Sequence, residues 1–299
     1  MIYTCTTNPS LDYYITFDDE LVVGKNNRSS MELYDAGGKG VNVSIVLNNF
    51  HIPSVCLGFL GGFTKDYYLK FISNYPNIQP LFTTISDNTR INIKLMDTCN
   101  ETSLNAKGPH ISKEEFIKFR NRTNNIYEGD TFVLSGTVQD EIENDIIDLL
   151  HSLASDGVKI VLDTDKHIVD MCKDISVYML KLNDSFFTND SEENIINVCK
   201  ELVECGFKNV MYSNAKKPSF LFTKDKSYRC NNIENNLVNT TGSSDSMVAG
   251  FLYSDLRGSN AYESFKYANA ASIATSLTND LSSRNIIEER FNNIEVIEL

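Results

Sequence analysis

The sequence predicts an α/β fold in which helices cover both faces of a largely parallel sheet. Short apolar runs alternate with longer segments in which apolar residues recur every three or four positions, as expected for strands alternating with helices. The apolar runs are continuous, which is typical of strands buried on both faces. With 299 residues, 41% of them hydrophobic, the chain suits one large domain with a small appendage.

The alternation starts at the N-terminus and covers most of the chain. Residues 1–5 form an apolar run without the charged start of a signal peptide, so we expect a strand there. Further strands are expected at residues 55–59, 131–135, 158–163, 178–182 and 209–212, with helices at 65–74, 140–155 and 191–205. This order predicts a sheet with a helical layer on each side.

Two segments, approximately residues 12–34 and 88–106, interrupt the alternation and look like β ribbons. In the second, a period of two places Arg90, Asn92 and Lys94 on one face. Two interpretations remain open: a strand with a solvated side, or a lid whose charged face covers an anionic ligand. Because no internal repeat or linker is evident, we predict a single domain, residues 1–299, with a discontinuous β lid.

Charge and cysteine content restrict the partners and the compartment. The formal net charge of −13 disfavours nucleic acid and anionic membranes, so neither is expected as a partner. Seven scattered cysteines without a CxxC pair indicate reduced thiols in the cytoplasm. No histidine spacing completes a zinc site, and no run approaches the ~18 apolar residues of a membrane span.

The first phosphate-related motif is the glycine-rich segment 35–43, which opens a helix that is expected to reach about residue 50. Its glycines let the backbone turn sharply and approach a ligand closely. The start of the helix offers free N–H groups and a positive dipole end to an anion. Lys39 adds a full charge and Asn42 adds a donor and an acceptor. A glycine-rich turn with a solvated lysine is the alternative.

Two better-known nucleotide-binding motifs do not fit this segment. A P-loop would need glycine at position 33 and serine or threonine at position 40, where the chain has Leu33 and Gly40. The segment does not match GxGxxG either, so a dinucleotide-dependent enzyme loses its main support.

The second motif, residues 239–252, joins a loop to an apolar helix. Backbone amides at the start of that helix are suited to stabilise charge on a transferring phosphoryl group. Asp245 is suited to accept the proton of an attacking sugar hydroxyl. The alternative is a capping network in which Ser243, Ser244 and Asp245 satisfy the free donors of the helix.

With the two motifs about 200 residues apart and in this order, the chain resembles the ribokinase-like (PfkB-type) carbohydrate kinases. The resemblance is to their 1-phosphofructokinase and tagatose-6-phosphate kinase branch and covers nearly the whole chain. The matching segments are residues 1–4, 7–13, 27–28, 36–43, 58–64, 87–94, 105–109, 129–136, 161–164 and 240–252.

The resemblance implies a ribokinase-like three-layer α/β/α sandwich with a mostly parallel central sheet and a small β-sheet lid. It also implies ATP as donor, Mg2+, and a homodimer formed through the lid. The implied reaction is ATP-dependent phosphorylation of a ketohexose monophosphate, with fructose 1-phosphate preferred and tagatose 6-phosphate as the alternative.

The resemblance also assigns roles to individual residues. The implied sugar-phosphate site consists of Asp12, Arg28, Gly37, Gly38, Lys39, Asn42, Arg90 and Lys94. Gly242, Ser243 and Ser244 correspond to the anion hole and Asp245 to the catalytic base. The implied nucleotide site consists of Lys181, Asn183, Ser213, Ala215, Gly242 and Asn269.

The chain departs from the family pattern at four places. Ser244 replaces the second glycine of G-A-G-D, and Phe186 replaces the glutamate of K-P-N-x-x-E that helps to organise magnesium. Residues 213–219 lack both glycines of the nucleotide loop, and residues 135–139 differ from S-G-S-[LI]-P. Two hypotheses therefore remain open: an active kinase with altered nucleotide or metal handling, and a kinase-derived protein that binds or senses a phosphosugar.

Overall fold

The computed structural model describes residues 1–189, 191–214, 217–231 and 242–299. Among these residues the largest element is an 11-stranded sheet with the order β15-β14-β13-β12-β11-β10-β9-β1-β4-β5, in which β6 also pairs with β4. Its strands are β1 (Ile2–Thr6), β4 (Ser54–Gly61), β5 (Ile78–Pro80), β6 (Thr83–Ile85), β9 (Thr131–Ser135), β10 (Lys159–Asp163), β11 (Val177–Leu182), β12 (Asn209–Asn214), β13 (Lys217–Thr223), β14 (Ser227–Cys230) and β15 (Val296–Glu298).

The centre of this sheet is parallel and its C-terminal part is antiparallel. Strands β4, β1, β9, β10, β11 and β12 pair in parallel, whereas β13, β14 and β15 pair antiparallel. Parallel strands end at a common edge, and ligands of open α/β sheets bind outside that edge. Ser135 and Asp163 are neighbours at this edge, so a site is expected there.

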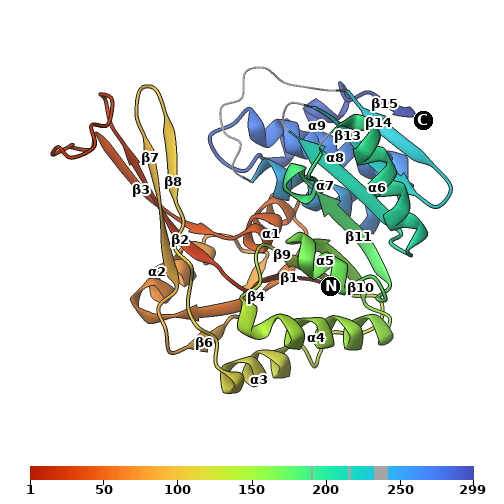
Figure 1. Cartoon of the computed structure of the whole chain (residues 1–299), viewed down its shortest axis with the longest axis horizontal. Coiled ribbons are helices and arrows are strands. Elements are labelled where there is room, and N and C mark those ends of the chain that lie inside the picture. Colours follow the sequence, from red (N-terminus) through yellow and green to blue (C-terminus); the bar gives the residue numbers. More distant parts are fainter. Residues whose placement is uncertain (190, 215–216, 232–241) are drawn as a thin grey trace.

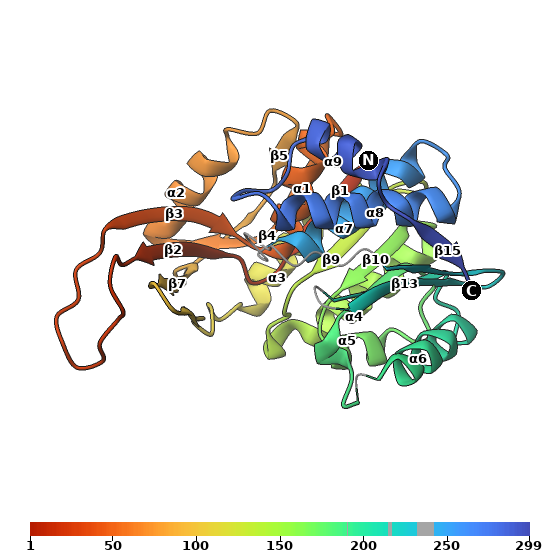
Figure 2. The ribbon, with the colours of Figure 1, turned by 90° about the horizontal axis from the view of Figure 1, so that it is seen from above.

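Two helical layers cover the sheet, and Figure 2 shows the strands between them. One layer contains α1 (Lys39–Asn49), α7 (Ser243–Leu256), α8 (Ala261–Ser276) and α9 (Arg284–Phe291); the other contains α3 (Lys113–Arg122), α4 (Glu143–Ser155), α5 (Lys166–Met171) and α6 (Glu192–Glu204). Successive residues of β10 pack on opposite faces of the sheet. Ile160 and Leu162 belong to the core under the second layer, and Val161 belongs to the core under the first. This arrangement confirms the predicted three-layer fold class.

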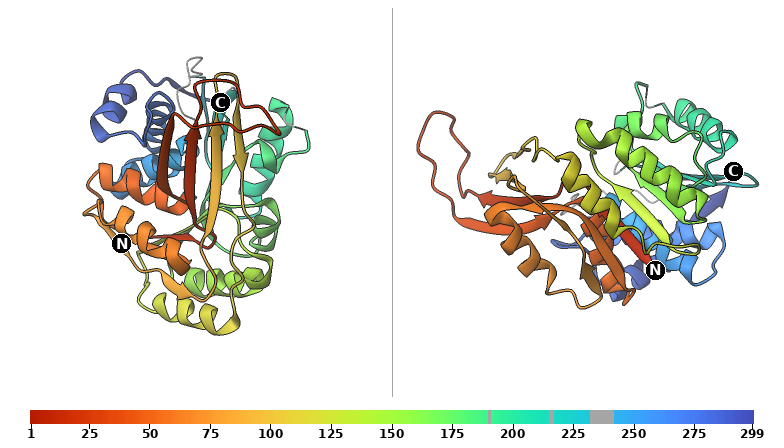
Figure 3. Two further views of the ribbon diagram at one scale, coloured as in Figure 1. Left: turned by 90° about the vertical axis from the view of Figure 1, so that its left-hand side faces the viewer. Right: turned by 90° about the horizontal axis from the view of Figure 1, so that it is seen from below.

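A separate four-stranded sheet projects from the large one, beside α2 (Gly62–Ile72) (Figure 1). Its order is β3-β2-β7-β8, with β2 (Ser10–Thr16), β3 (Met31–Gly37), β7 (Arg90–Met96) and β8 (Glu101–Leu104). Strand β3 extends into the glycine-rich motif, farther than the sequence predicted. Figure 3 shows the four strands standing in front of the large sheet.

The register of the small sheet determines which side chains share a face. Asp12 lies opposite Asp35 on β3 and opposite Asn92 on β7, while Ser10 lies opposite Arg90. Directly paired residues point to the same side of a sheet. The predicted polar face of Arg90, Asn92 and Lys94 is therefore real, and β2 and β3 add two carboxylates to it.

Within the described residues, no helix combines the length and the apolar character that a bilayer crossing would need. Two short 3-10 turns, η1 (Asp140–Ile142) and η2 (Asp184–Phe186), complete the elements.

Candidate active site

Helix α7 begins with Asp245 in its first turn, directed toward α1. The residue before the helix, Gly242, has φ 76°, a left-handed conformation that favours glycine. A Cβ there would lie 2.5 Å from Leu281 Cδ2, so the turn has no room for a side chain. Asp245 is 4% exposed, and its Oδ2 accepts a hydrogen bond from Asn42 Nδ2 at 2.8 Å. The two sequence motifs therefore meet through these two side chains.

Two lysines surround a buried carboxylate at the carboxyl end of β10. Asp163 Oδ1 accepts a hydrogen bond from Lys39 Nζ at 3.2 Å and lies 3.7 Å from Lys181 Nζ. The Lys181 side chain is completely buried and donates a hydrogen bond to Ser244 Oγ. The lysines are held at the start of α7, where the helix dipole also favours an anion.

The electrostatics of this cluster leave Asp245 poised near neutral pH. Burial raises the pKa of Asp245 to about 6, and Asp163 adds to the increase, while Lys39, Asn42 and Lys181 oppose it. A carboxyl group with such a pKa is ionised at pH 7 and still basic enough to accept a proton, as a general base requires. Burial lowers the pKa of Lys181. For Lys39 the effect of burial is outweighed by Asp163 and Asp245, so the pKa is raised.

The glycines at the start of α1 bring the backbone against the root of the small sheet. A Cβ on Gly37 would lie 2.5 Å from Asp12 Oδ2, and one on Gly38 would lie 2.9 Å from Thr6 Cγ2. Gly38 also has φ 143°, which disfavours other residues. Tyr68 donates to the Gly37 carbonyl at 2.9 Å. This close approach places Lys39 and Asn42 beside the polar face of the small sheet.

That face contains an acid held by neutral donors. Asp12 Oδ1 accepts hydrogen bonds from Ser10 Oγ at 2.6 Å and from Asn92 Nδ2 at 3.0 Å. The side chain is 9% exposed, and neither of these bonds involves Oδ2. Asp12 is thus oriented with one oxygen available to a hydroxyl donor.

Arg90 is a partly buried cation that forms no ion pair with a carboxylate of the described residues. Its Nη1 donates to the Ala106 carbonyl at 3.0 Å and its Nη2 to the Asn8 carbonyl at 2.8 Å, while the buried Nε has no hydrogen-bond partner. Burial lowers the pKa of Arg90, against the effect of Asp12. Because only neutral carbonyls contact the guanidinium, its charge remains available to an anion.

The comparisons with known proteins agree with this geometry. Residues 7–284 match the family described as pfkB family carbohydrate kinases. The chain belongs to that family. A 1-phosphofructokinase from Borreliella burgdorferi is 36% identical, with 94% of this chain and 93% of the relative covered. A D-tagatose-1-phosphate kinase from Bacillus licheniformis is 29% identical, with 100% of both chains covered.

A solved structure shows the same fold. Phosphofructokinase-2 from Escherichia coli has a TM-score of 0.91 to this chain, at 18% identity and with 98% of each chain covered. Membership of the pfkB family makes the chain a sugar kinase that uses ATP as phosphoryl donor.

Not every residue predicted for the sugar site of this pfkB kinase lies near Asp245. Lys94 donates to Ser103 Oγ at 2.9 Å, farther along the small sheet. Arg28 is exposed in the loop between β2 and β3, which projects away from the large sheet (Figure 2). The phosphate-binding roles of these two residues stay predictions.

The predicted nucleotide residues are less closely grouped. Asn183 Oδ1 accepts from the Ser185 N–H at 3.0 Å and caps η2. Asn269 accepts from Ser219 Oγ at 2.5 Å and donates to the Phe265 carbonyl at 2.8 Å, so both ends of its amide are used within the fold. Ser213 is half-buried on β12. Ala215 lies outside the described residues.

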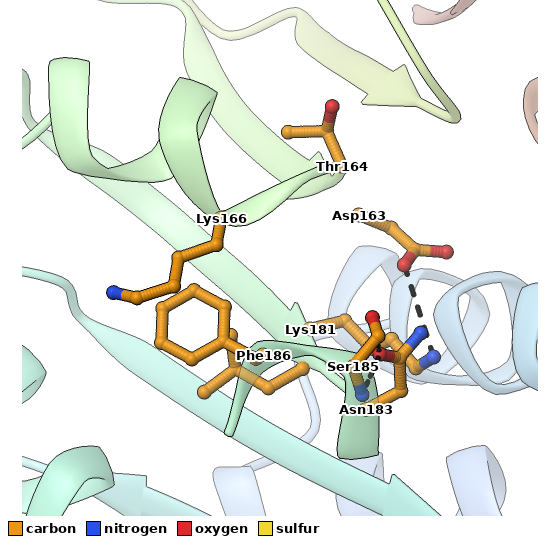
Figure 4. A pocket seen from close by; sticks show the side chains of 8 residues that line it. Asp163, Thr164, Lys166, Lys181, Asn183, Ser185 and Phe186 are labelled. Atoms are coloured by element: carbon orange, nitrogen blue, oxygen red, sulfur yellow. Dashed lines mark hydrogen bonds and ion pairs between the residues drawn. The ribbon is translucent and has the colours of Figure 1, made fainter. Parts of the chain in front are cut away.

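A small hollow adjoins the cluster on the nucleotide side (Figure 4). The hollow is small and partly open to solvent. Its lining residues are Asp163, Thr164, Lys166, Lys181, Leu182, Asn183, Ser185 and Phe186. The hollow is therefore polar at the Asp163 end and apolar at the Phe186 end.

The two departures next to this hollow have different consequences. Phe186 is 8% exposed in the core, and Lys166 Nζ lies 4.5 Å from the centre of its ring. Asp184 does not take over from the missing glutamate, because its oxygens accept hydrogen bonds from Tyr212 and Asn214. Ser244 lies within α7. His51 is the one non-glycine residue with positive φ in the described chain, so the serine is not strained there.

Sequence reasoning did not assign a role to Asp163, although the structure places it between Lys39 and Lys181. A signal was present, because Asp163 ends an apolar run that predicts a central strand, and the carboxyl ends of parallel strands carry ligand-binding residues. Asn92, the partner of Asp12, was placed on the correct face without a function.

Proposed function

We propose that the chain phosphorylates fructose 1-phosphate at its 6-hydroxyl group, with ATP as donor, to give fructose 1,6-bisphosphate. The arrangement of Asp245 carries this proposal: the carboxylate is buried at the start of α7, held by Asn42 at 2.8 Å, and surrounded by Lys39, Lys181 and Asp163. The relative named 1-phosphofructokinase supports the choice of substrate.

The reaction needs one proton acceptor and several groups that offset negative charge. Asp245 removes the proton of the 6-hydroxyl as its oxygen attacks the γ-phosphate of ATP. Gly242, Ser243 and Ser244 stand at the start of α7, where backbone N–H groups of a helix favour developing negative charge. Lys39 contributes a cation fixed by Asp163, 3.2 Å away. Fixed groups of this kind stabilise a transition state with little reorganisation.

The phosphate already on the sugar is assigned to Arg90. This guanidinium has only carbonyl partners and an unpartnered buried Nε. It lies on the face of the small sheet that also carries Asp12. The small sheet then acts as a lid that holds the hydroxyl groups through Asp12 and the phosphate through Arg90. In this proposal residues 1–299 form one kinase domain with that lid.

Magnesium, which the family implies, fits the residues present when the nucleotide supplies most of its ligands. Mg2+ is commonly held by one or two carboxylates together with substrate phosphates. Asp163 offers a buried Oδ2 without a hydrogen-bond partner, at the edge of the hollow in Figure 4. The ion would neutralise charge on the β- and γ-phosphates. Phe186 offers no ligand, and the described residues contain no cluster of three potential ligands.

Replacing Phe186 with glutamate is expected to lower, several-fold, the magnesium concentration that gives half-maximal activity. The new carboxylate would enter the hollow that Asp163 also lines and could reach the ion as a second oxygen ligand. The melting temperature should fall, because a buried aromatic ring is lost. Initial rates against free Mg2+ provide the measurement, and Phe186→Gln is the matched control. Equal magnesium curves for both variants would count against a metal position next to Asp163.

We also propose that two copies of the chain pair through their lids. Met31 is 57% exposed and Leu33 is 54% exposed, and both lie on the face that carries Asp35 nearer the root of the sheet. Exposed apolar side chains on the outer half of this face, beside Lys94, are suited to a partner surface. No disulfide joins the seven cysteines in the described residues, and we propose a cytoplasmic location.

Replacing Leu33 with aspartate is therefore expected to convert the dimer to monomer. A charge placed in an apolar interface is costly to desolvate. Sedimentation velocity measures the change, with Leu256→Asp as the control, because Leu256 is 50% exposed at the far end of α7. A wild-type monomer, or a Leu33→Asp dimer as tight as the wild type, contradicts the lid interface.

Two alternatives are kept because specific observations favour them. A tagatose phosphate remains a candidate substrate because a relative is named D-tagatose-1-phosphate kinase. A phosphosugar-binding protein remains a candidate because Phe186 supplies no metal ligand. Transfer from magnesium-ATP to fructose 1-phosphate, tagatose 6-phosphate and fructose 6-phosphate, followed by 31P NMR of each product, tests the substrate. Faster transfer to either of the other sugars would overturn the choice of fructose 1-phosphate.

A further inference from the structure

Asp35 is a second carboxylate on the lid face, directly opposite Asp12 in the β2–β3 register. Side chains at such paired positions share a face, with Cβ atoms about 4.5–5.5 Å apart. Asp35 Oδ1 accepts a hydrogen bond from the Ala36 N–H at 2.7 Å, which leaves Oδ2 outside this bond. Neither Asp35 nor Asp12 forms an ion pair within the described residues.

Two like charges at directly paired positions destabilise a sheet, and partial burial increases the cost. Burial raises the pKa of Asp35 to about 6, and Asp12 and Asp280 add to the increase against the Ala36 hydrogen bond. The tyrosines Tyr14, Tyr68 and Tyr75 also lie within electrostatic range. Arg90 on the same face acts on Asp12, whereas the groups that act on Asp35 are acids, tyrosines and the Ala36 N–H. Asp35 therefore has an oxygen suited to a hydrogen-bond donor from a ligand.

We propose that Asp35 is a specificity-determining residue that accepts a hydrogen bond from a ring hydroxyl of the ketohexose phosphate next to the hydroxyl held by Asp12. This inference rests on the proposed function and gives a role to Asp35, the first residue of the glycine-rich motif, to which the sequence assigned none. Two carboxylates on adjacent rigid strands form a pair of acceptors for two neighbouring hydroxyl groups.

In this proposal the two carboxylates of Asp12 and Asp35 distinguish sugars that differ in the configuration of one ring carbon. Inverting one ring carbon moves its hydroxyl to the other side of the ring and leaves one carboxylate without its donor. A site built to hydrogen-bond a hydroxyl discriminates strongly against an analogue that lacks it, because the buried group is left unpaired. Fructose 1-phosphate and tagatose 1-phosphate are such a pair: they differ only at carbon 4 and share the phosphate and the free 6-hydroxyl.

Isothermal titration of both sugar phosphates without ATP tests the proposal, with wild type, Asp35→Asn and Asp35→Ala. Wild type should prefer one epimer, and Asp35→Ala should weaken that epimer about tenfold or more while hardly changing the other. The ratio of the two dissociation constants then falls toward one. Asp35→Asn retains an oxygen for the Ala36 N–H and removes the repulsion from Asp12, so it should give an intermediate loss of affinity with a melting temperature that does not fall. Asp66 is an exposed carboxylate on α2, and Asp66→Asn is the control because it changes the net charge by the same amount.

The pH dependence separates this role from a structural one. A protonated Asp35 resembles the asparagine variant, so the difference in affinity between wild type and Asp35→Asn should be full at pH 7.5 and shrink below pH 6. Equal weakening of both epimers, or no weakening in Asp35→Ala, would overturn the proposal. Binding by wild type without turnover would contradict the kinase function and leave this test intact. Absence of any binding by wild type would overturn both.

Discussion

Replacing Asp245 with alanine is expected to lower kcat by about 10²- to 10⁴-fold, the usual contribution of a positioned general base. The affinity for the sugar phosphate should change little, because in the proposed site Asp12 and Arg90, not Asp245, bind the sugar phosphate. Stopped-time assays for kcat and calorimetry for the sugar-phosphate Kd provide the two readouts. Asp245→Asn is the matched control, since it keeps the shape of the side chain but not the basic oxygen.

The pH profile of the wild type provides a second test of the same role. A base acts only when it is deprotonated, and the pKa of Asp245 is raised to about 6. The activity should therefore be constant above about pH 7 and fall as the pH decreases through 6. Turnover by Asp245→Ala within a factor of about three of the wild type would refute the assignment of the base.

Replacing Arg90 with alanine is expected to weaken binding of fructose 1-phosphate by about ten- to a hundredfold and that of free fructose far less. A charge-assisted hydrogen bond contributes about 1.5–3 kcal/mol. Free fructose has no phosphate, so it cannot form this bond with Arg90. Comparing the two Kd values for wild type and variant isolates the phosphate contribution.

Arg90 also bonds the carbonyls of Ala106 and Asn8, so its removal affects the packing between β7 and two loops. Arg90→Lys keeps the charge but not the planar donor group and should recover part of the affinity. A melting curve separates loss of fold from loss of binding. Equal losses for fructose and its phosphate would show that Arg90 supports structure rather than the phosphate.

The sequence predicted those parts of the fold and site that depend on local chemistry. Continuous apolar runs identified the parallel strands, and the alternation in residues 89–95 identified the face of Arg90, Asn92 and Lys94, which the register confirms. Glycines at 37 and 38 predicted a close backbone approach to a ligand. The structure shows the side chains of Asp12 and Thr6 against them, and the approach to a ligand stays a prediction.

The remaining features depend on pairings between distant segments. The opposition of Asp12 and Asp35 follows from the β2–β3 register, which a loop of 14 residues does not specify. Asp163 gains its importance from Lys39 and Lys181, which lie on other elements. The hydrogen-bond partners of Asp184 could not be predicted from the sequence either, because Tyr212 and Asn214 lie about thirty residues away.

The most direct test of the central claim is single-turnover transfer from magnesium-ATP to fructose 1-phosphate, beside a binding titration of the same sugar with the same protein. The account predicts tight binding together with formation of fructose 1,6-bisphosphate, and loss of the product but not of the binding in Asp245→Ala. Binding without product would contradict it and would show that the chain holds a phosphosugar on a kinase fold without transferring phosphate.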